Sequence, residues 1–303
     1  MTPAPQASRL NERSISKFMR AIKTVFLLTA LTLLLVLGGE AIAGQRGMTL
    51  GLVMAVVMNG VAYFFSDKIA LMSSGAQPVS REQIPRLYQV MERLCAKANL
   101  SMPKLYVIPQ AAPNAFATGR NPSHASVAVT AGLMELMNDD ELEGVIAHEL
   151  SHVRNYDILI TSIAATLAGA ITWIASMGRW AMIFGGFGGS REDNRGGGGL
   201  AALVMLIVAP IAALLIQLGI SRQREFAADA SGARMVGNQY GLISALEKLG
   251  AYNKRIPMDV SPTTASLFIV APLTAGQVFS GMFSTHPPLS ERIAVLRNMT
   301  ITR

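Results

Sequence analysis

The stretch His148-Glu149-Leu150-Ser151-His152 decides how this chain folds and what it can bind. Two histidines four residues apart lie on one face of a helix, one turn apart. This spacing lets both imidazoles ligate one zinc ion, and Glu149 is placed to take a proton from a metal-bound water. The alternative is a surface helix whose two histidines are only solvated. Since the chain holds only four histidines and offers a third ligand, we favour the metal site.

Long apolar runs place this motif beside a membrane. The chain has 303 residues, of which 51% are hydrophobic and 15% charged, whereas soluble domains hold about 25% charged residues. Four runs approach the roughly 20 residues that span a bilayer: Thr24–Ala43, Thr49–Ser66, Ile158–Gly178 and Leu200–Ile220. The third run begins six residues after His152. If one helix carries both, the metal lies roughly 9 Å from the membrane entry point.

Charge predicts the orientation of these runs. Five basic residues and one acidic residue lie between Arg9 and Lys23, whereas the link Gly44–Met48 holds only Arg46. The positive-inside rule therefore puts the N-terminus in the cytoplasm. The net charge of +7 favours an anionic lipid surface. Nucleic acid binding is disfavoured, because no basic stripe with interleaved aromatic residues is present. The single cysteine, Cys95, excludes an intrachain disulfide and suits a reducing compartment.

The runs divide the chain into alternating membrane and cytoplasmic parts. We expect a basic cytoplasmic tail (1–23), a transmembrane hairpin (24–66), a first cytoplasmic part (67–157), a second transmembrane hairpin (158–220) and a second cytoplasmic part (221–303). The outer loop Gly185–Gly199 contains eight glycines. It is no phosphate cradle, because neither a strand before it nor a Lys-Ser/Thr pair after it is present.

Local patterns in the first cytoplasmic part predict a small sheet and the metal-binding helix. Helical periodicity covers Arg81–Asn99, strands are predicted at Lys104–Pro109 and Ala125–Thr130, and Asn114–Gly119 is an extended piece between them. Asn138 is a suitable N-cap, and the three acidic residues after it suit the positive end of a helix dipole. We expect this helix to carry both histidines.

Glu225 is the candidate third ligand. It lies five residues beyond the fourth run, a distance similar to that from His152 to the third run. If both helices leave the membrane as an antiparallel pair, Glu225 and His152 emerge at similar height. Asp229, one turn later, could accept a hydrogen bond from a ligating imidazole. The alternative for Glu225 is a surface salt bridge with a neighbouring arginine. Asp157 is a rival ligand that points off the metal face, and we interpret it as a cap or interface residue.

Four motifs in order resemble the HtpX family of membrane-embedded zinc metalloproteases, relatives of the integral-membrane prenyl-protein (CaaX) endopeptidases. They are N-A-F-A-T-G at 114–119, V-I-A-H-E-L-S-H at 145–152, E-F-A-A-D at 225–229 and S-T-H-P-P-L-S-E-R-I at 284–293. The resemblance covers nearly the whole chain. It implies a mainly α integral membrane protein, with four transmembrane helices and a cytoplasmic gluzincin-type zinc protease domain that contains a small β-sheet.

The resemblance also implies site residues. One Zn²⁺ per chain is expected on His148, His152 and Glu225, with Glu149 as the base. His286 and Arg292 are expected near the reacting carbonyl, where either could stabilise an oxyanion. The substrate groove is expected along Asn114, Ala115, Phe116 and Ala117, because an exposed edge strand can pair with an extended peptide. The alternatives are an ordinary sheet strand at 114–117 and, for His286, a packing role at the start of a helix.

The expected function is zinc-dependent endopeptidase activity on membrane or membrane-proximal proteins. The resemblance adds protein quality control under stress in a bacterial-type inner membrane, with both termini and the active site in the cytoplasm. Three alternatives stay open: a prenyl-protein endopeptidase, a membrane chaperone or scaffold with structural zinc, and a transporter. Structural zinc would need a fourth protein ligand. A transporter would need ionisable residues inside its spans, and the third and fourth runs hold none. The apolar stretch Ser266–Leu273 is a lid, a membrane contact or core.

Overall fold

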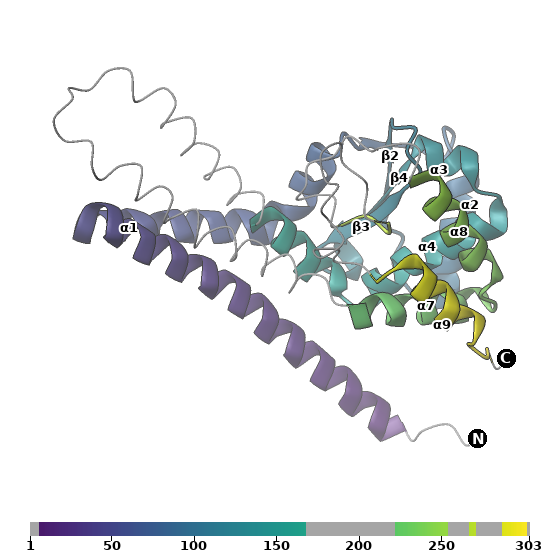
Figure 1. Cartoon of the computed structure of the whole chain (residues 1–303), viewed down its shortest axis with the longest axis horizontal. Coiled ribbons are helices and arrows are strands. Elements are labelled where there is room, and N and C mark those ends of the chain that lie inside the picture. Colours follow the sequence, from purple (N-terminus) through teal and green to yellow (C-terminus); the bar gives the residue numbers. More distant parts are fainter. Residues whose placement is uncertain (1–5, 168–221, 254–266, 271–286, 302–303) are drawn as a thin grey trace.

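A helical hairpin projects from a mixed α/β domain in the computed structural model of this chain (Figure 1). The structure describes residues 6–167, 222–253, 267–270 and 287–301. The hairpin is α1 (Gln6–Ser73), whose two arms run antiparallel on one side of the domain. The remaining elements build the domain around a four-stranded sheet.

The hairpin of α1 turns at Gly44, whose φ of +59° lies in the left-handed region that favours glycine. Its arms then approach closely, since a Cβ added at Gly51 would lie 2.2 Å from the carbonyl oxygen of Leu35. A polar contact also joins the arms, because Asn59 Nδ2 donates to Thr32 Oγ1 at 2.9 Å. The first two apolar runs therefore form a helical hairpin, and its crossing of a membrane stays a prediction.

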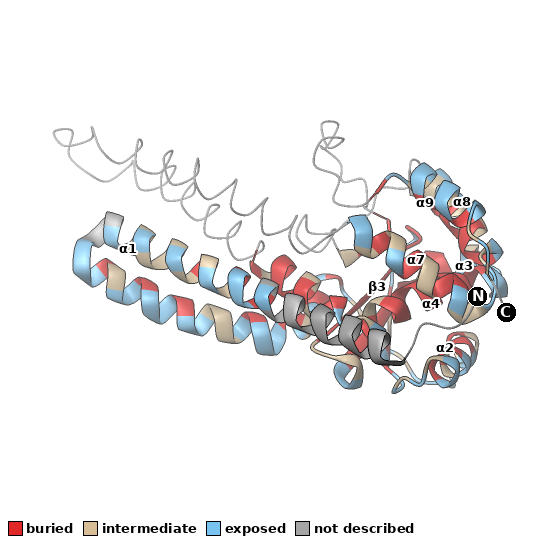
Figure 2. Cartoon of the chain, turned by 90° about the horizontal axis from the view of Figure 1, so that it is seen from below, coloured by how far each residue is buried: buried red, intermediate tan, exposed pale blue. Residues whose placement is uncertain are grey.

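Apolar side chains are exposed on α1 from Ile22 onward. Large hydrophobic side chains stay exposed along both arms, among them Phe26, Leu37, Leu50, Val56 and Phe64, and Figure 2 shows exposed residues along the length of the hairpin. An exposed apolar surface of this extent is typical of a membrane contact.

The predicted count of four spans is not confirmed. Among the described residues, Gly44–Ser73 is the one helix long and apolar enough to cross a membrane, while Thr24–Glu40 and Asp157–Leu167 are apolar but shorter. The rest of the third run, the fourth run and the glycine-rich loop lie outside the described residues.

The sheet has the strand order β1-β2-β4-β3. Its strands are β1 (Gln77–Pro78), β2 (Lys104–Ile108), β3 (Ala115–Gly119) and β4 (Ala125–Thr130). β2 and β4 are parallel, whereas β1 and β3 pair antiparallel with their neighbours. Both predicted strands are confirmed, and the predicted extended piece becomes the edge strand β3. Ala115 and Ala117 face the main core, while Phe116 points to the opposite face.

The central helix α4 (Asp139–Arg154) carries the two motif histidines and is buried along most of its length. It begins as predicted, since Asn138 Oδ1 accepts from the backbone N–H of Glu141 and Glu141 Oε2 accepts from that of Asn138, both at 2.9 Å. This reciprocal capping box satisfies two donors at the helix start.

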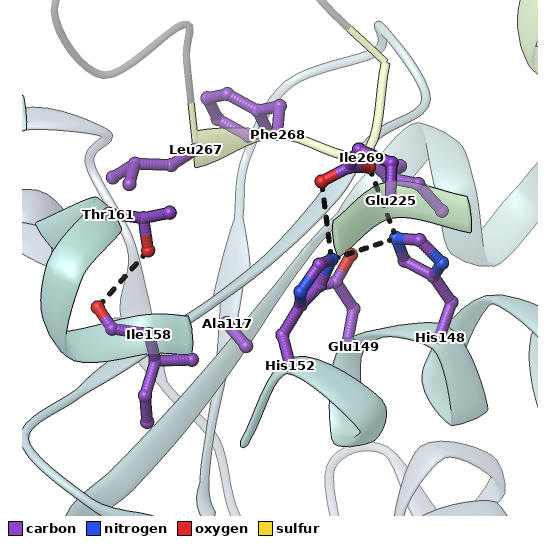
Figure 3. A pocket seen from close by; sticks show the side chains of 10 residues that line it. All are labelled: Ala117, His148, Glu149, His152, Ile158, Thr161, Glu225, Leu267, Phe268 and Ile269. Carbon is purple, nitrogen blue, oxygen red and sulfur yellow. Dashed lines mark hydrogen bonds and ion pairs between the residues drawn. The ribbon is translucent and has the colours of Figure 1, made fainter. Parts of the chain in front are cut away.

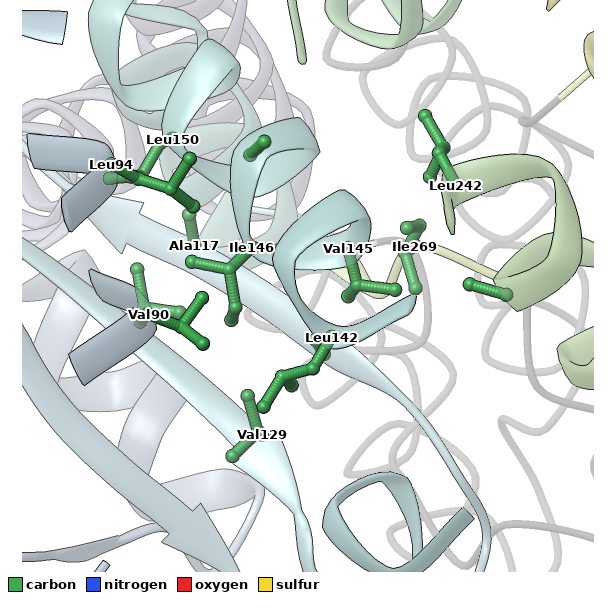
Figure 4. Close-up of a cluster of buried hydrophobic side chains, with 14 of the residues drawn as sticks. Val90, Leu94, Ala117, Val129, Leu142, Val145, Ile146, Leu150, Leu242 and Ile269 are labelled. Carbon is green, nitrogen blue, oxygen red and sulfur yellow. The ribbon is translucent and has the colours of Figure 1, made fainter. Parts of the chain in front are cut away.

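Five further helices lie in the described domain, besides the apolar helix that begins at Asp157. They are α2 (Pro85–Ala98), α3 (Ala131–Leu136), α7 (Arg222–Val236), α8 (Tyr240–Asn253) and α9 (Leu289–Arg297), and a 3₁₀ turn spans Pro122–His124. Figure 4 shows apolar side chains of α4 packed against α2, β4 and α8. This core fixes the orientation of the helix that holds the motif.

The helix that carries the motif does not continue into the third apolar run, so this part of the prediction was wrong. α4 ends at Arg154, and Tyr156 has a φ of +60°. A right-handed helix cannot pass through a residue in this left-handed conformation. A new helix begins at Asp157 and is described to Leu167. The break brings Asp157 back toward His152, as the site shows.

Candidate metal and active site

Three predicted ligands from two helices meet in one pocket. The ligand atoms of His148, His152 and Glu225 lie within 4.8 Å of one another. The two histidine Nε2 atoms are 3.2 Å apart, and the Glu225 carboxylate oxygens lie 3.7 Å from His148 Nε2 and 3.5 Å from His152 Nε2. Figure 3 shows the histidines rising from α4 toward Glu225 on α7.

A glycine lets these two helices approach closely. Gly232 of α7 lies against α4, where an added Cβ would be 2.9 Å from the backbone nitrogen of His148. A side chain at this position would therefore push α7 away from α4. Because α7 carries Glu225 and Asp229, its separation from α4 decides whether the third ligand reaches the histidines.

The second nitrogen of each imidazole faces a carboxylate. His148 Nδ1 lies 2.8 Å from Asp229 Oδ1, and His152 Nδ1 lies 3.3 Å from Asp157 Oδ2. A carboxylate at Nδ1 favours the tautomer that carries its proton there, which leaves the lone pair of Nε2 free. Two such nitrogens beside the carboxylate of Glu225 form a set of three electron-pair donors. These ligand types and this number fit a zinc ion with an open coordination position.

The site attracts positive charge. Burial opposes protonation of His152, but the carboxylates of Glu225 and Asp157 raise the pKa of this histidine to about 9. Burial, together with the Arg292 guanidinium, lowers the pKa of His148. The carboxylates that favour a proton on His152 would also favour a metal cation at the same place. This negative potential supports the fit of a metal.

Glu149 lines the same pocket and is buried. Burial raises its pKa to about 7, with a further contribution from Glu225, while His152 and the backbone N–H of Ala117 act in the opposite direction. A carboxyl group with a pKa near neutrality can accept and return a proton at physiological pH.

Arg292 lies beside His148 and Glu225, and it is not among the residues that line the described pocket. Its side chain is fully buried, with Nε 2.8 Å from Asp229 Oδ2, Nη2 2.7 Å from Asp229 Oδ1, and Nη1 2.9 Å from the carbonyl oxygen of Ile269. Although burial opposes it, Arg292 holds the pKa of Asp229 at about 2. The guanidinium also lies beside two of the predicted ligands, with Nη2 3.3 Å from His148 Nδ1 and Nη1 3.7 Å from Glu225 Oε2. His286, the other residue expected near the reacting carbonyl, lies outside the described residues.

The predicted substrate strand β3 lies at the sheet edge, but its expected exposure was wrong. All five residues of β3 are buried. The segment Leu267–Val270 covers its first half, since the backbone N–H of Ile269 donates to the carbonyl oxygen of Ala115 at 2.9 Å. Of the four residues expected in the groove, Ala117 alone lines the described pocket.

Two parts of the site were missed from the sequence. The sequence predicts that Asp157 is a cap or interface residue, whereas its carboxylate faces His152. This contact depends on the left-handed turn at Tyr156, which no feature of the surrounding sequence predicts. Leu267, Phe268 and Ile269 line the pocket, and residues 268–270 are buried. The sequence had left this stretch open between lid, membrane contact and core.

Comparison with known proteins places the chain in a family. The sequence pattern of peptidase family M48 matches residues 81–300. The "Protease HtpX homolog" of Desulfatibacillum aliphaticivorans is 57% identical over 275 residues, which cover 91% of this chain and 88% of that protein. That of Syntrophobacter fumaroxidans is 51% identical over 278 residues, covering 91% and 98%. The crystal structure of S. mikatae Ste24p is 19% identical, with a TM-score of 0.45 over 94% of this chain and 66% of that one. The chain belongs to peptidase family M48.

Proposed function

We propose that this chain is a membrane-embedded zinc-dependent endopeptidase that hydrolyses peptide bonds of membrane or membrane-proximal proteins. The observation that carries the proposal is the meeting of His148, His152 and Glu225 within 4.8 Å, with the buried carboxyl group of Glu149 in the same pocket. Membership of a peptidase family supports it.

The chemistry assigned to each residue follows from its contacts. We infer that His148, His152 and Glu225 hold one Zn²⁺ per chain. Bound zinc lowers the pKa of a coordinated water from about 15.7 toward about 7. Glu149 accepts the proton of the attacking water and returns it to the leaving amine. Because the pKa of Glu149 is about 7, both transfers are possible near neutral pH.

The residues around the ligands orient them. Asp229 and Asp157 hold the rings of His148 and His152 through their Nδ1 atoms. We assign Arg292 to positioning Asp229, since its guanidinium is buried and bonded on that side. His286 stays the proposed donor to the oxyanion, on the resemblance to the family alone.

The position of the pocket supports membrane-proximal substrates. The Lys68 ammonium lies 5.4 Å from the ring centroid of Phe65, and the Arg120 guanidinium lies 6.0 Å from that of Phe64. Basic side chains near the end of an apolar span typically reach toward the membrane–water interface. Arg120 directly follows β3, three residues beyond Ala117 of the pocket, which corresponds to about 10 Å of strand. A pocket at this height reaches polypeptides that leave or lie on the bilayer.

We further propose four membrane spans in a bacterial-type inner membrane, with the termini and the site in the cytoplasm. The basic N-terminal tail supports this orientation. A role in protein quality control under stress rests on the resemblance to the HtpX family. A prenyl-protein endopeptidase is the second candidate within the same chemistry. A scaffold with structural zinc would need a fourth ligand, and the cluster found among the described residues has three.

Metal analysis and proteolysis test the proposal together. Detergent-purified full chain should contain one zinc per chain and cleave casein, and a chelator should abolish the cleavage. Glu149→Gln should keep the zinc and lose about 10²- to 10⁴-fold or more of the activity, whereas His148→Ala should lose both. Undiminished proteolysis by Glu149→Gln would remove the mechanism. Cleavage of the same peptide with and without a lipid distinguishes the two candidate endopeptidases, because only a prenyl-protein endopeptidase requires the lipid.

A further inference from the structure

The outer edge of β3, on the side away from β4, is paired with the segment Leu267–Val270 of the same chain. In an antiparallel strand, the N–H and C=O groups of alternate residues point to opposite sides. The carbonyl oxygen of Asn114 accepts from Thr130 on the β4 side, so the groups of Ala115 point to the outer edge. There the carbonyl oxygen of Ala115 accepts from the N–H of Ile269 at 2.9 Å.

The side chain of Asn114 extends this pairing. Its Nδ2 donates to the carbonyl oxygen of Val270 at 2.8 Å, and its Oδ1 accepts from the N–H of Val270 at 3.4 Å. The carboxamide thus presents one donor and one acceptor to a backbone, as a neighbouring peptide unit would. Ile269 and Val270 are therefore bonded to the edge by three hydrogen bonds.

Side chains fix the segment from both sides. The rings of Phe268 and Phe116 meet edge to face with centroids 5.1 Å apart, and both are fully buried. On the opposite side, Arg292 Nη1 donates to the carbonyl oxygen of Ile269 at 2.9 Å. Leu267, Phe268 and Ile269 also line the pocket that holds Glu149 (Figure 3).

A peptide that pairs with this edge needs the groups that the segment already uses. Recognition by strand addition depends on free backbone donors and acceptors along the edge. The Ala115 carbonyl and the Asn114 carboxamide are both taken. We propose that Leu267–Val270 is a built-in competitor of the substrate, so that peptide binding displaces it from β3. This inference rests on the proposed function, and it concerns the regulation of the same site.

Phe268 and Arg292 both hold the segment closed, since displacement also breaks the hydrogen bond from Arg292 Nη1 to the carbonyl oxygen of Ile269. The three hydrogen bonds to Asn114 and Ala115 are replaced one for one when a peptide backbone binds, so they favour neither state. The contact of Phe268 with Phe116 has no such replacement. An aromatic pair of this kind corresponds to about a two- to tenfold change in an equilibrium constant. The apparent affinity for substrate equals the affinity of the open state multiplied by the fraction of molecules that are open.

Hydrogen exchange on the full-length zinc-loaded chain tests displacement directly. The probe is the Glu149→Gln variant in detergent, with and without a saturating unlabelled casein peptide that wild-type protein cleaves. We expect faster exchange at Ile269 and Val270 when the peptide is bound, and unchanged exchange in β4 and α9. Unchanged or slower exchange at 269–270 would show a permanent wall of the site and overturn the inference.

A variant that removes the ring of Phe268 gives an independent test. Phe268→Ala should lower KM for the same peptide about two- to tenfold with little change in kcat, because the open state becomes more populated. Leu94→Ala, a buried position of α2 that lies across α4 from Ile269 (Figure 4), is the control for lost stability and should not lower KM. An unchanged or raised KM in Phe268→Ala contradicts the proposal that Phe268 holds the segment on β3. If Phe268→Ala does not fold, the exchange experiment decides alone.

The two proposals fail in different ways. Wild-type protein that holds no zinc and cleaves no peptide would end the proposed function, and this inference with it. Wild-type protein that cleaves the peptide while residues 267–270 keep their protection would end the inference alone.

Discussion

Arg292 binds both carboxylate oxygens of Asp229, through Nε at 2.8 Å and Nη2 at 2.7 Å, in a fully buried pair. Asp229 in turn lies 2.8 Å from Nδ1 of His148. The pair thus joins α9 and α7 to the face of α4 that carries both motif histidines. A buried charge is tolerated only when it is paired and hydrogen-bonded, so each partner depends on the other.

Arg292→Gln should destabilise the protein and weaken metal binding. The change leaves the carboxylate of Asp229 buried without its cation, which costs about 3–5 kcal/mol. It also loosens the group that orients His148, and loss of such a partner typically lowers metal affinity about 10- to 100-fold. Thermal unfolding and zinc competition with a chromophoric chelator measure the two effects.

Arg297→Gln is the matched control on the same helix. Arg297 pairs with Glu247 at 2.6 Å, but both side chains are largely exposed. A surface pair of this kind contributes about 0–1 kcal/mol, and it has no contact with the metal ligands. Equal losses of stability or zinc affinity in the two variants would contradict the special role of Arg292.

Asp157→Asn should weaken zinc binding while keeping the fold. Asp157 Oδ2 lies 3.3 Å from Nδ1 of His152, and a neutral amide orients and polarises that ring less than a carboxylate does. We expect about a 10- to 100-fold loss of zinc affinity. Asp139→Asn, at an exposed pair at the start of α4, is the control and should bind zinc as wild type does. Unchanged affinity in Asp157→Asn would show that Asp157 is only a helix cap.

Much of the α/β domain was predictable because its signals are local. The cap at Asn138, the strand signal in Ala125–Thr130 and the four-residue spacing of His148 and His152 each act within a few neighbours. The spacing of Glu225 from the fourth run also placed it near the histidines. That argument assumed a straight helix, and the left-handed turn at Tyr156 breaks it, although the ligands still meet.

The covering of β3 could not be predicted for the opposite reason. Residues 269 and 270 reach Asn114 and Ala115 across more than 150 residues of sequence. No periodicity or turn pattern reports such a pairing, because it depends on how the whole domain closes. The apolar stretch around Phe268 therefore suggested burial, but not which surface would bury it.

Gly232→Ala should separate the two helices that carry the ligands. An added Cβ would lie 2.9 Å from the backbone nitrogen of His148 and 3.1 Å from the carbonyl carbon of Ala147, and neither backbone atom can move freely. Overpacking of this kind costs about 1–3 kcal/mol, and it moves Glu225 away from the histidines. Thermal unfolding and zinc content of the purified variant measure both outcomes.

Gly250→Ala is the control for this glycine. The added Cβ would meet Leu289 Cδ1 at 3.0 Å, which is the flexible end of a side chain, and alanine favours a helix interior over glycine. We therefore expect unchanged zinc content and little loss of stability. Full zinc occupancy in Gly232→Ala would show that the close approach of α4 and α7 is not what assembles the site.

The pH dependence of activity should follow Glu149. As the base it must be ionised, and burial raises its pKa to about 7 in the metal-free pocket. A cation on the adjacent ligands favours the carboxylate and so lowers this pKa. We therefore expect kcat/KM of the zinc-loaded protein to rise with pH along an acidic limb whose midpoint lies at or below about 7, and then to level. A profile that keeps rising above pH 8, or falls between pH 5 and 7, contradicts this role.

The pH dependence of the free energy of unfolding of the metal-free protein also reports on Glu149. The pKa of Glu149 in the folded state, about 7, lies above its ordinary value of 4.5, so the folded state binds this proton more tightly than the unfolded state. Its contribution to stability is therefore present below about pH 4.5 and is lost as pH rises to about 7. Glu149→Gln cannot ionise and should not show this loss. Chemical denaturation of chelator-treated wild type and variant at pH 4.5 and 7.5 measures the difference, and parallel stability changes in the two proteins would place the titrating group elsewhere.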